Sequence, residues 1–310
     1  MLFEVIFFIL SCLFLVLSGS WTIKYITRLA ASLRISHFSI GFIIMALATS
    51  FPELFVGISS ALAKNPSISL GNVIGANILD LTLVIAIPAL LGAGIKIKSK
   101  TLKRDSIMML LTALAPLILT AFDKTLSRSD GVILILIFIV YGWHLFTEKI
   151  DFKTNIEKKN TDKIINILFF LGSIMILFLS SKFVVKFGSE IANGIGLPAI
   201  FVGLLFISLG TTLPELTFNI HSVLKKKPDL AVGNSMGSVI CNSLLVLGVT
   251  SIIHPIQNGF TIFFTSAIFM ILISMLFIFF IKREKGLSIT QAIILIILYV
   301  LFLMFEFFFK

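Results

Sequence analysis

Two short stretches of the sequence place a carboxylate directly after a proline in otherwise apolar surroundings. The first is ALATSFPELFVG at residues 46–57, which carries Glu53, and the second is SLGTTLPELTFN at residues 208–219, which carries Glu215. A charge in the hydrocarbon core of a membrane costs about 3 kcal/mol even on lenient scales, so such an acid should be paired or ligated. Neither stretch contains Lys or Arg. We therefore expect the partner of each acid to be a bound cation or a proton.

The proline before each acid predicts further oxygen ligands nearby. A proline cannot donate its helical hydrogen bond, so Pro52 and Pro214 each leave a carbonyl without its partner in the preceding turn. Thr49 and Thr211 precede the acids by four residues, which puts hydroxyl and carboxylate on one helical face. Carboxylate, hydroxyl and carbonyl oxygens suit hard cations such as Ca²⁺ and Na⁺, whereas His and thiolate ligands suit zinc or copper.

The composition places these acids in an integral membrane protein. Of 310 residues, 58% are apolar and 13% are charged, and the mean hydropathy is +1.10. Apolar runs near twenty residues long favour helices over the alternating strands of a barrel. The net charge of +10 resides in short loops between the apolar runs, which is the positive-inside pattern and gives no reason to expect a nucleic-acid partner. Cys12 and Cys241 lie in apolar runs, and we expect no disulfide between them.

The apolar runs predict an all-α protein with ten transmembrane helices. These span residues 2–27, 38–62, 68–93, 106–122, 131–147, 164–192, 198–223, 230–253, 260–281 and 287–309. Loops rich in Lys and Arg alternate with loops that hold few. This asymmetry predicts a multi-pass protein of the cell membrane with both termini extracellular and residues 148–163 as a cytoplasmic linker.

The two halves of the chain repeat each other. Moving the first half by 162 residues (215 − 53) superposes the motifs without a gap, and residues 1–147 and 164–310 are predicted to be two five-helix repeats. An odd number of helices per repeat turns the second repeat upside down relative to the first. Inverted repeats are typical of transporters that bind their substrate near the midplane of the bilayer.

A second motif follows each acid. GNVIGANILD at residues 71–80 corresponds to GNSMGSVICN at residues 233–242. The Gly-xxx-Gly spacing in both copies predicts a helix face that packs closely against a neighbour. Asp80 and Asn242 occupy equivalent positions, so Asp80 is a third acid in an apolar segment. Three carboxylates exceed the charge of one Ca²⁺ and match the charge of three Na⁺.

The paired motifs closely resemble the two alpha-repeats of the sodium/calcium exchanger family, within the cation/calcium antiporter superfamily. The resemblance implies a ten-helix inverted-repeat fold that exchanges Ca²⁺ for Na⁺ by alternating access, while the first and sixth helices slide across the core. It also implies the bound cargo ions Ca²⁺ and Na⁺, no cofactor, and a protein that works as a monomer.

The resemblance further implies a set of ligands. Glu53 and Glu215 would coordinate Ca²⁺ centrally, with Thr49 and Thr211 as oxygen ligands. Asp80 and Asn242 would line the middle of the site. Flanking Na⁺ sites would be completed by Ser50, Thr212, Ser238 and the carbonyls of Ala46 and Ser208.

The chain departs from the microbial members of this family in two places. There the amide usually stands in the first repeat and the acid in the second, whereas here Asp80 comes first and Asn242 second. Ala76 stands where a serine ligand is expected, although its counterpart Ser238 is present. Both departures bear on the number and identity of the counter-ions, so exchange coupled to H⁺ or K⁺ stays an alternative.

Two functions from other classes are also open to test. A passive cation channel would conduct without counter-transport. An intramembrane enzyme with paired carboxylates would need a nucleophile or metal motif, and the chain has no His-Glu-x-x-His and no Asp-rich prenyl-diphosphate motif. The sequence therefore predicts a transporter rather than an enzyme.

Overall fold

The computed structural model of the protein describes residues 2–32, 46–97, 102–121, 123–147, 163–257 and 259–308. Residues 46–49 are also helical. The α-helices are α1 (Leu2–Ser32), α3 (Phe51–Leu62), α4 (Ser67–Leu81), α5 (Leu83–Leu91), α6 (Leu102–Thr120), α7 (Arg128–Thr147), α8 (Lys163–Ile195), α9 (Ala199–Val202), α10 (Ser208–Thr211), α11 (Leu213–Leu224), α12 (Pro228–Ile240), α13 (Leu247–Ile253), α14 (Phe260–Glu284) and α15 (Ile289–Phe308). Two π-helices, η1 (Gly203–Ile207) and η2 (Cys241–Val246), and two strands, β1 (Ile95–Lys96) and β2 (Gly286–Leu287), complete the described elements.

Eight segments of the described residues are long and apolar enough to cross a membrane, so the chain is an all-helical, multi-pass membrane protein. They are Leu2–Ile26, Ser67–Leu91, Arg128–Leu145, Ile164–Ile195, Ala199–Leu224, Pro228–Ile253, Phe260–Glu284 and Ile289–Phe308. The other two predicted helices correspond to the shorter apolar helix α3 and to α6. Residues 38–45 of the predicted second helix and 148–162 of the predicted linker lie outside the described residues. The count of ten transmembrane helices stays a prediction.

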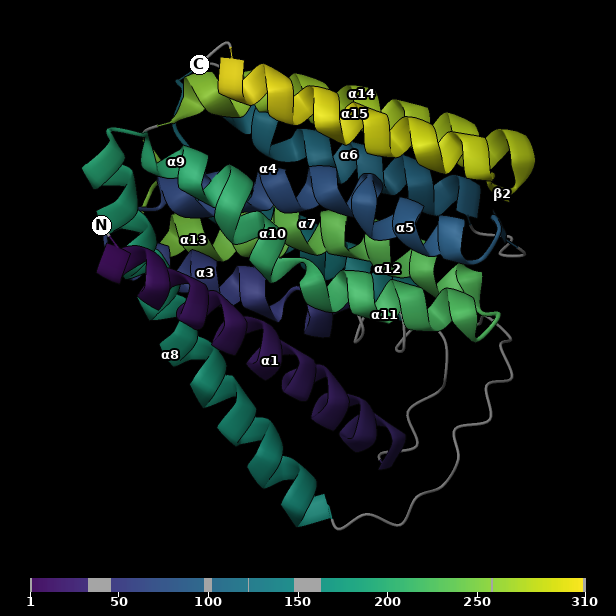
Figure 1. Ribbon diagram of the computed structural model, residues 1–310, viewed down its shortest axis with the longest axis horizontal. Helices are drawn as coiled ribbons and strands as arrows, with labels where there is room; N and C mark the ends of the chain where they lie inside the picture. The colour runs from purple at the N-terminus through teal and green to yellow at the C-terminus, as the bar shows by residue number, and fades with distance from the viewer. Residues whose placement is uncertain are drawn as a thin grey trace.

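The long helices α1 and α8 lie side by side and lean obliquely against the other helices (Figure 1). They run antiparallel, because Tyr25 stacks on Phe169 near one end and Phe7 contacts Phe187 near the other. Between these rings the Thr22 hydroxyl donates to Ser173 Oγ at 3.0 Å. We call α1 and α8 the outer pair and the remaining helices the inner bundle.

Glycines bring two helical segments of the inner bundle into backbone contact. All residues of α4 are buried. A Cβ atom at Gly71 would lie 2.0 Å from the Ile200 carbonyl oxygen, and one at Gly75 would lie 2.2 Å from the Leu204 carbonyl oxygen. Any larger residue at either position would displace the backbone of the facing helix. The Gly-xxx-Gly face of the first repeat is therefore a close packing surface, as predicted.

Short antiparallel pairings join the two halves of the chain. β1 pairs with β2 through Ile95 and Leu287, at the end of the bundle away from the two marked chain ends (Figure 1). A second, isolated bridge joins Leu126 to Ile256. Moving each partner of the first pairing by the 162-residue repeat offset gives 257 opposite 125, which has the same antiparallel register as the isolated bridge. The two pairings are thus related by the offset between the repeats.

Helix interruptions also occur at equivalent places in the two halves. The segment 46–49 ends at Ser50, with φ −79° and ψ 5°, and α10 ends at Thr212, with φ −86° and ψ 0°. These residues are one repeat offset apart, and each precedes the proline at the start of the next helix. The prolines thus break the helices directly before Glu53 and Glu215, as the sequence predicts.

Candidate functional site

The residues predicted as ion ligands all lie inside the protein, and none is more than 3% exposed. They come from the helix breaks, from α4 and from the junction of α12 with η2. The full set is Ala46, Thr49, Ser50, Glu53, Asp80, Ser208, Thr211, Thr212, Glu215, Ser238 and Asn242.

Three buried acids from three different helices approach one another. Asp80 on α4 lies within electrostatic range of Glu53 on α3, and Glu215 on α11 lies within range of both. Within the described residues no hydrogen-bond donor meets any of their carboxylate oxygens. Carboxylates that are close together and desolvated repel each other strongly, so the cluster requires protons or bound cations for compensation.

The backbone around two of the acids favours their negative charge. Glu53 lies in the first turn of α3, and Glu215 lies in the first turn of α11. The unsatisfied N–H groups at a helix N-terminus favour negative charge. The proline breaks thus create two helix N-termini, one at each acid, inside an apolar protein.

The threonines of each half face the acid of the other half. Thr211 lies close enough to Glu53 to interact with it, and Thr49 lies close enough to Glu215 to do the same. Neither contact meets hydrogen-bond geometry. The i, i+4 spacing places Thr49 and Glu53 on one helical face, whereas the structure adds a contact between halves that spacing along one helix cannot reveal.

Two asparagines from the second motif hold these threonines reciprocally. Thr49 Oγ1 donates to Asn234 Oδ1 at 3.2 Å, and Thr211 Oγ1 donates to Asn72 Oδ1 at 3.1 Å. Each bond maps onto the other when both partners move by the repeat offset. Ser238 Oγ lies 3.4 Å from Thr49 Oγ1. The asparagines thus support the proline-broken segments.

Other polar atoms of this region are buried without a hydrogen-bond partner. Both side-chain polar atoms of Asn242, the hydroxyl of Ser50 and Oδ1 of Asn77 have none. Buried polar groups are nearly always hydrogen-bonded, so such a cluster requires an explanation. A bound cation would satisfy the oxygen atoms among them.

The donor set determines how a cation would be held. Among the described residues, no three His, Cys, Asp or Glu side chains are arranged to hold a metal ion by themselves. A cation bound here would have hydroxyl, amide and carbonyl oxygens among its ligands. The carbonyls of Ala46 and Ser208 accept the backbone N–H groups of Ser50 and Thr212 at 3.0 and 3.1 Å. Each carbonyl oxygen also lies within hydrogen-bond distance of a threonine hydroxyl, Ala46 O at 3.2 Å from Thr49 Oγ1 and Ser208 O at 2.8 Å from Thr212 Oγ1. An ion bound there would take the place of the hydroxyl at the second lone pair.

Comparison with known proteins shows which family has this arrangement. The family described as sodium/calcium exchanger protein matches residues 3–147 and 165–308. The chain belongs to the sodium/calcium exchanger family. It is 33% identical to the putative antiporter CaxA of Alkalimonas amylolytica over 82% of both chains. It is 27% identical to the sodium/calcium exchanger MaX1 of Methanosarcina acetivorans over 95% of this chain and 96% of that protein.

The fold of this antiporter is also known from solved structures. The structure of the sodium-calcium exchanger NCX_Mj superposes with a TM-score of 0.67 at 24% identity and covers 96% of both chains. The family consists of membrane transporters, and the resemblance stated from the two motifs is confirmed.

A pocket of about 550 Å³ in this antiporter lies between α1 of the outer pair and α11 of the inner bundle. Ser20 and Ile23 of α1 form one wall, and Pro214, Thr217 and other residues of α11 form the opposite wall. Pro214 directly precedes Glu215 in the chain, whereas Glu53, Asp80 and Glu215 themselves do not line this pocket and are fully buried.

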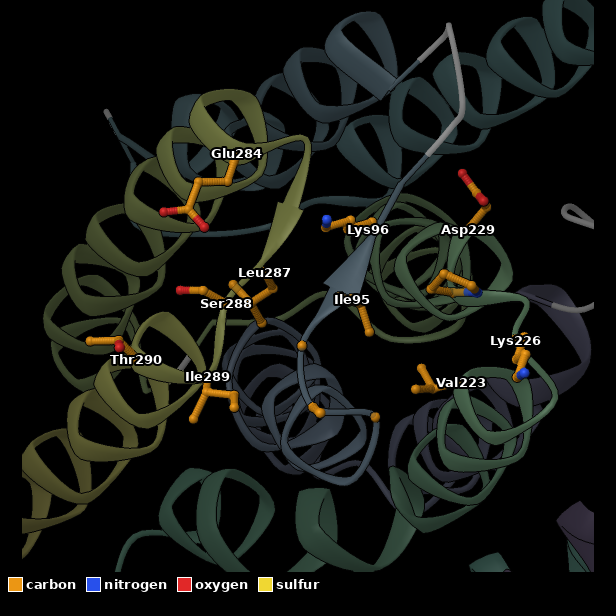
Figure 2. A pocket seen from close by; sticks show the side chains of 14 residues that line it. Ile95, Lys96, Val223, Lys226, Asp229, Glu284, Leu287, Ser288, Ile289 and Thr290 are labelled. Carbon is orange, nitrogen blue, oxygen red and sulfur yellow. The ribbon is translucent and has the colours of Figure 1, made fainter.

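A larger pocket, of about 760 Å³, lies elsewhere. Its wall includes β1, the end of β2 and the starts of α12 and α15, and Lys96 and Lys226 line it together with Glu284 and Asp229 (Figure 2). None of the predicted ligands lines this pocket. Its mixed charges do not resemble the uncharged oxygens around the three acids.

The five residues GNSMG at 233–237 match the Gly-x-Ser-x-Gly pattern of hydrolase nucleophiles. That pattern requires a sharp turn from strand to helix, whereas Ser235 lies within α12 and accepts a hydrogen bond from Asn219 Nδ2 at 2.9 Å. The local structure is therefore not a nucleophile elbow.

Three buried polar residues escaped the sequence analysis. Asn219 contacts Asn234, and Asn77 donates to Ser243 Oγ at 3.0 Å. Asn77 lies within the second motif itself, so its position was a usable signal. Asn219 and Ser243 have non-polar counterparts one repeat offset away, Gly57 and Leu81, so the repeat does not mark them.

Proposed function

We propose that the protein exchanges Ca²⁺ for Na⁺ across the membrane by alternating access. The observation that supports this most directly is the cluster of three buried acids whose oxygens meet no donor within the described residues. Structural acids in an apolar interior would be neutralised by donors or basic side chains. Carboxylates left to an exchangeable cation fit a transport site.

In this proposal Glu53 and Glu215 bind Ca²⁺ at the centre, with the hydroxyls of Thr49 and Thr211. Asp80 and Asn242 line the middle of the site. Na⁺ sites on either side use the remaining predicted oxygen ligands. These are Ser50, Thr212, Ser238 and the carbonyls of Ala46 and Ser208.

The proposal includes two inverted five-helix repeats, residues 1–147 and 164–310, joined by a cytoplasmic linker. The reciprocal bonds of Thr49 with Asn234 and of Thr211 with Asn72 support it. The matching registers of the two short antiparallel pairings support it as well. Lysines near the β1–β2 pairing, at the end away from the chain termini (Figure 1), favour cytoplasmic exposure of that end.

The chemistry of exchange follows from charge. Ca²⁺ and Na⁺ compete for the same oxygens, so the protein binds one kind of ion at a time. Occupancy neutralises the acids, and a neutral site is easier to enclose within apolar surroundings than an empty, charged one. Exchange of three Na⁺ for one Ca²⁺ moves one net charge, to which a membrane potential contributes about 2.3 kcal/mol per 100 mV.

The movement that exposes the site is assigned to the outer pair. The helix α1 passes over both proline breaks at Gly19. A Cβ atom at Gly19 would lie 3.0 Å from Pro52 Cγ and 3.5 Å from Pro214 Cγ. A small residue at this crossing permits sliding. The pocket between α1 and α11 lies at this interface and is lined by Pro214, the residue before Glu215.

Uptake of ⁴⁵Ca²⁺ into proteoliposomes under imposed ion gradients tests the function. Uptake should follow an outward Na⁺ gradient. Uptake that ignores Na⁺ and follows a pH or K⁺ gradient would establish the alternatives coupled to H⁺ or K⁺. Flux without stimulation by ions on the opposite side would establish a channel.

Neutralising either central acid tests the site. Glu53→Gln and Glu215→Gln should each lower exchange at least 100-fold, because each removes a charged ligand while preserving side-chain shape. Elution as a monodisperse species checks folding. Wild-type rates in both variants would disprove the assigned roles.

A further inference from the structure

The two halves of the candidate site are supported differently, although their threonine–asparagine bonds are reciprocal. Asn234 Nδ2 donates to Asn219 Oδ1 at 3.2 Å, so its amide is held on both sides. The equivalent Nδ2 of Asn72 is buried and has no hydrogen-bond partner. One offset before Asn219 stands Gly57, which has no side chain to offer.

The space next to Gly57 is occupied by another pair of side chains. A Cβ atom at Gly57 would lie 2.6 Å from Thr250 Oγ1 and 3.1 Å from Ser69 Oγ. These two hydroxyls are hydrogen-bonded to each other at 3.0 Å. No amide side chain at position 57 could therefore reach Asn72 as Asn219 reaches Asn234. The packing around Gly57 thus maintains the difference between the halves.

A backbone carbonyl fixes the orientation of both asparagine amides in the supported half. Asn219 Nδ2 lies 3.2 Å from the Val84 carbonyl oxygen, which can only accept, and so the Asn219 amide has one orientation. Its Oδ1 then faces Asn234, which must present Nδ2 in return. The Oδ1 of Asn234 consequently points at Thr49.

This orientation determines what Thr49 can offer to an ion. Since Asn234 presents only an acceptor, it cannot donate to Thr49, and the single hydroxyl hydrogen of Thr49 is directed toward Asn234 Oδ1 or the Ala46 carbonyl, both 3.2 Å away. Ser238, 3.4 Å away, has a hydroxyl that rotates. The lone pairs of Thr49 are thus available to a cation before it arrives. Such preorganisation lowers the cost of binding.

We propose that Asn219 is a positioning residue that preorganises the Thr49 half of the site, and that the Thr211 half lacks such support. The proposal deepens the function proposed above and rests on it for the identity of the ions. It makes the two halves unequal in their contribution to ion affinity. Thr49 contributes more than Thr211, although the two occupy equivalent positions.

A double-mutant cycle separates this role from general stabilisation. The single variants are Asn219→Ala, Thr49→Val and Thr211→Val, and Asn219→Ala is combined with each threonine variant. The readout is the half-saturating concentration of Na⁺, and separately of Ca²⁺, for raising the unfolding temperature of the purified protein. Exchange in proteoliposomes then provides the apparent affinity and the maximal rate.

Asn219→Ala and Thr49→Val should each weaken ion affinity about tenfold. Asn219→Ala leaves the buried Nδ2 of Asn234 without its acceptor, and Thr49→Val removes a hydroxyl ligand of the ion. Their combination should cost little more than either alone, since both interrupt the same chain of bonds. Asn219→Ala combined with Thr211→Val should instead multiply the separate effects. The maximal exchange rate of Asn219→Ala should stay within about twofold of wild type, since the residue does not contact the ion.

A conservative variant provides the rescue. Asn219→Asp, as a neutral buried acid, can donate to the Val84 carbonyl and accept from Asn234, so it should recover affinity to within about threefold of wild type. If Asn219→Ala does not yield folded protein, Asn219→Val replaces it in the cycle, because it fills the space without a polar atom.

The proposal would be overturned if Asn219→Ala multiplied the affinity losses of Thr49→Val and of Thr211→Val to the same extent. Unchanged ion affinity in Asn219→Ala would also overturn it. Binding of Na⁺ without any Ca²⁺ exchange by the wild type would refute the proposed function, while the Na⁺ cycle would still decide the role of Asn219. Absence of stabilisation by either ion would refute both.

Discussion

The outer pair and the two motif-bearing segments of the inner bundle are all strongly apolar in sequence but differ in how much of their surface is buried. In the apolar windows of α1 and α8, 28% of the residues are buried, against 83% for the segment that includes α4 and 78% for the segment that includes α12. Phe, Ile and Leu side chains cover the exposed faces of the outer pair, whereas the inner segments carry the motifs. Hydropathy identifies both as membrane helices and does not separate them.

The difference follows from what each helix must contact. Lipid accepts any large apolar side chain, so α1 and α8 need only a narrow strip of contact with the bundle. The inner segments contact protein on all sides, and their glycines permit backbone contact while their polar residues bond across the repeats. A loosely attached pair beside a tightly interlocked bundle is the arrangement expected when the pair moves and the bundle holds the ions.

Disulfide cross-links provide the largest test of this division. Ser59 Oγ on α3 lies 2.7 Å from Ser181 Oγ on α8, so Ser59→Cys with Ser181→Cys should form a disulfide that ties the outer pair to the bundle. Exchange should fall almost to background after oxidation and recover on reduction. Cys12 and Cys241, which are both free, are first replaced by alanine.

A cross-link within the outer pair serves as the matched control. Thr22 Oγ1 and Ser173 Oγ are 3.0 Å apart, and Thr22→Cys with Ser173→Cys should leave exchange within about twofold of wild type if the two helices move as a unit. Loss of exchange in the control, or normal exchange with α3 joined to α8, would contradict the division into a moving pair and a fixed bundle.

A pair of glycine substitutions tests the same comparison through stability. Gly71→Ala places a Cβ atom 2.0 Å from the Ile200 carbonyl oxygen and should destabilise the protein by about 1–3 kcal/mol. Gly172→Ala on α8 meets no atom within 4 Å and should be neutral or stabilise by up to about 1 kcal/mol. Thermal unfolding in detergent measures both. Equal changes in the two variants would mean that the inner contact adapts, contrary to the packing.

The features that sequence predicted best are those that repeat along the chain. Helix positions, both proline breaks and the close Gly-xxx-Gly contact follow from apolar runs and local chemistry, because each depends on residues within one or two turns. The family follows from motifs that occur twice. Burial of Glu53 and Glu215 follows because each acid lies within a long, mainly apolar run of the sequence.

The features that sequence missed depend on how the halves meet. Spacing along one helix pairs Thr49 with Glu53, while the contacts of Thr49 with Asn234 and Glu215 require the fold. Asn219 has the counterpart Gly57 in the first half, so repetition along the chain does not mark it as a site residue. The π-helix at Cys241–Val246, like the break at Thr82 one offset earlier, follows from tertiary packing and has no motif.

The smallest effect is expected from restoring a missing hydroxyl within the bundle. Ser238 Oγ lies 3.4 Å from Thr49 Oγ1, whereas its counterpart Ala76 has no oxygen to offer on the Thr211 side. Ala76→Ser adds one oxygen to a half that the structure leaves poorly supported. The concentration of Na⁺ that half-activates Ca²⁺ release should fall about threefold, as expected for one added polar contact.

The control for this substitution belongs to the outer pair. Ala192→Ser on α8 also adds a hydroxyl at a buried position, since Ala192 is 1% exposed, but α8 carries none of the predicted ligands. Its Na⁺ dependence should match that of wild type. A similar shift in both variants would mean that the added hydroxyls act through general packing, and an unchanged Na⁺ dependence in Ala76→Ser would place the Na⁺ ligands elsewhere. A steeper Na⁺ dependence confined to Ala76→Ser would instead mean that an additional Na⁺ binds in each cycle, which makes the two halves of the site more alike and the exchange more sensitive to membrane potential.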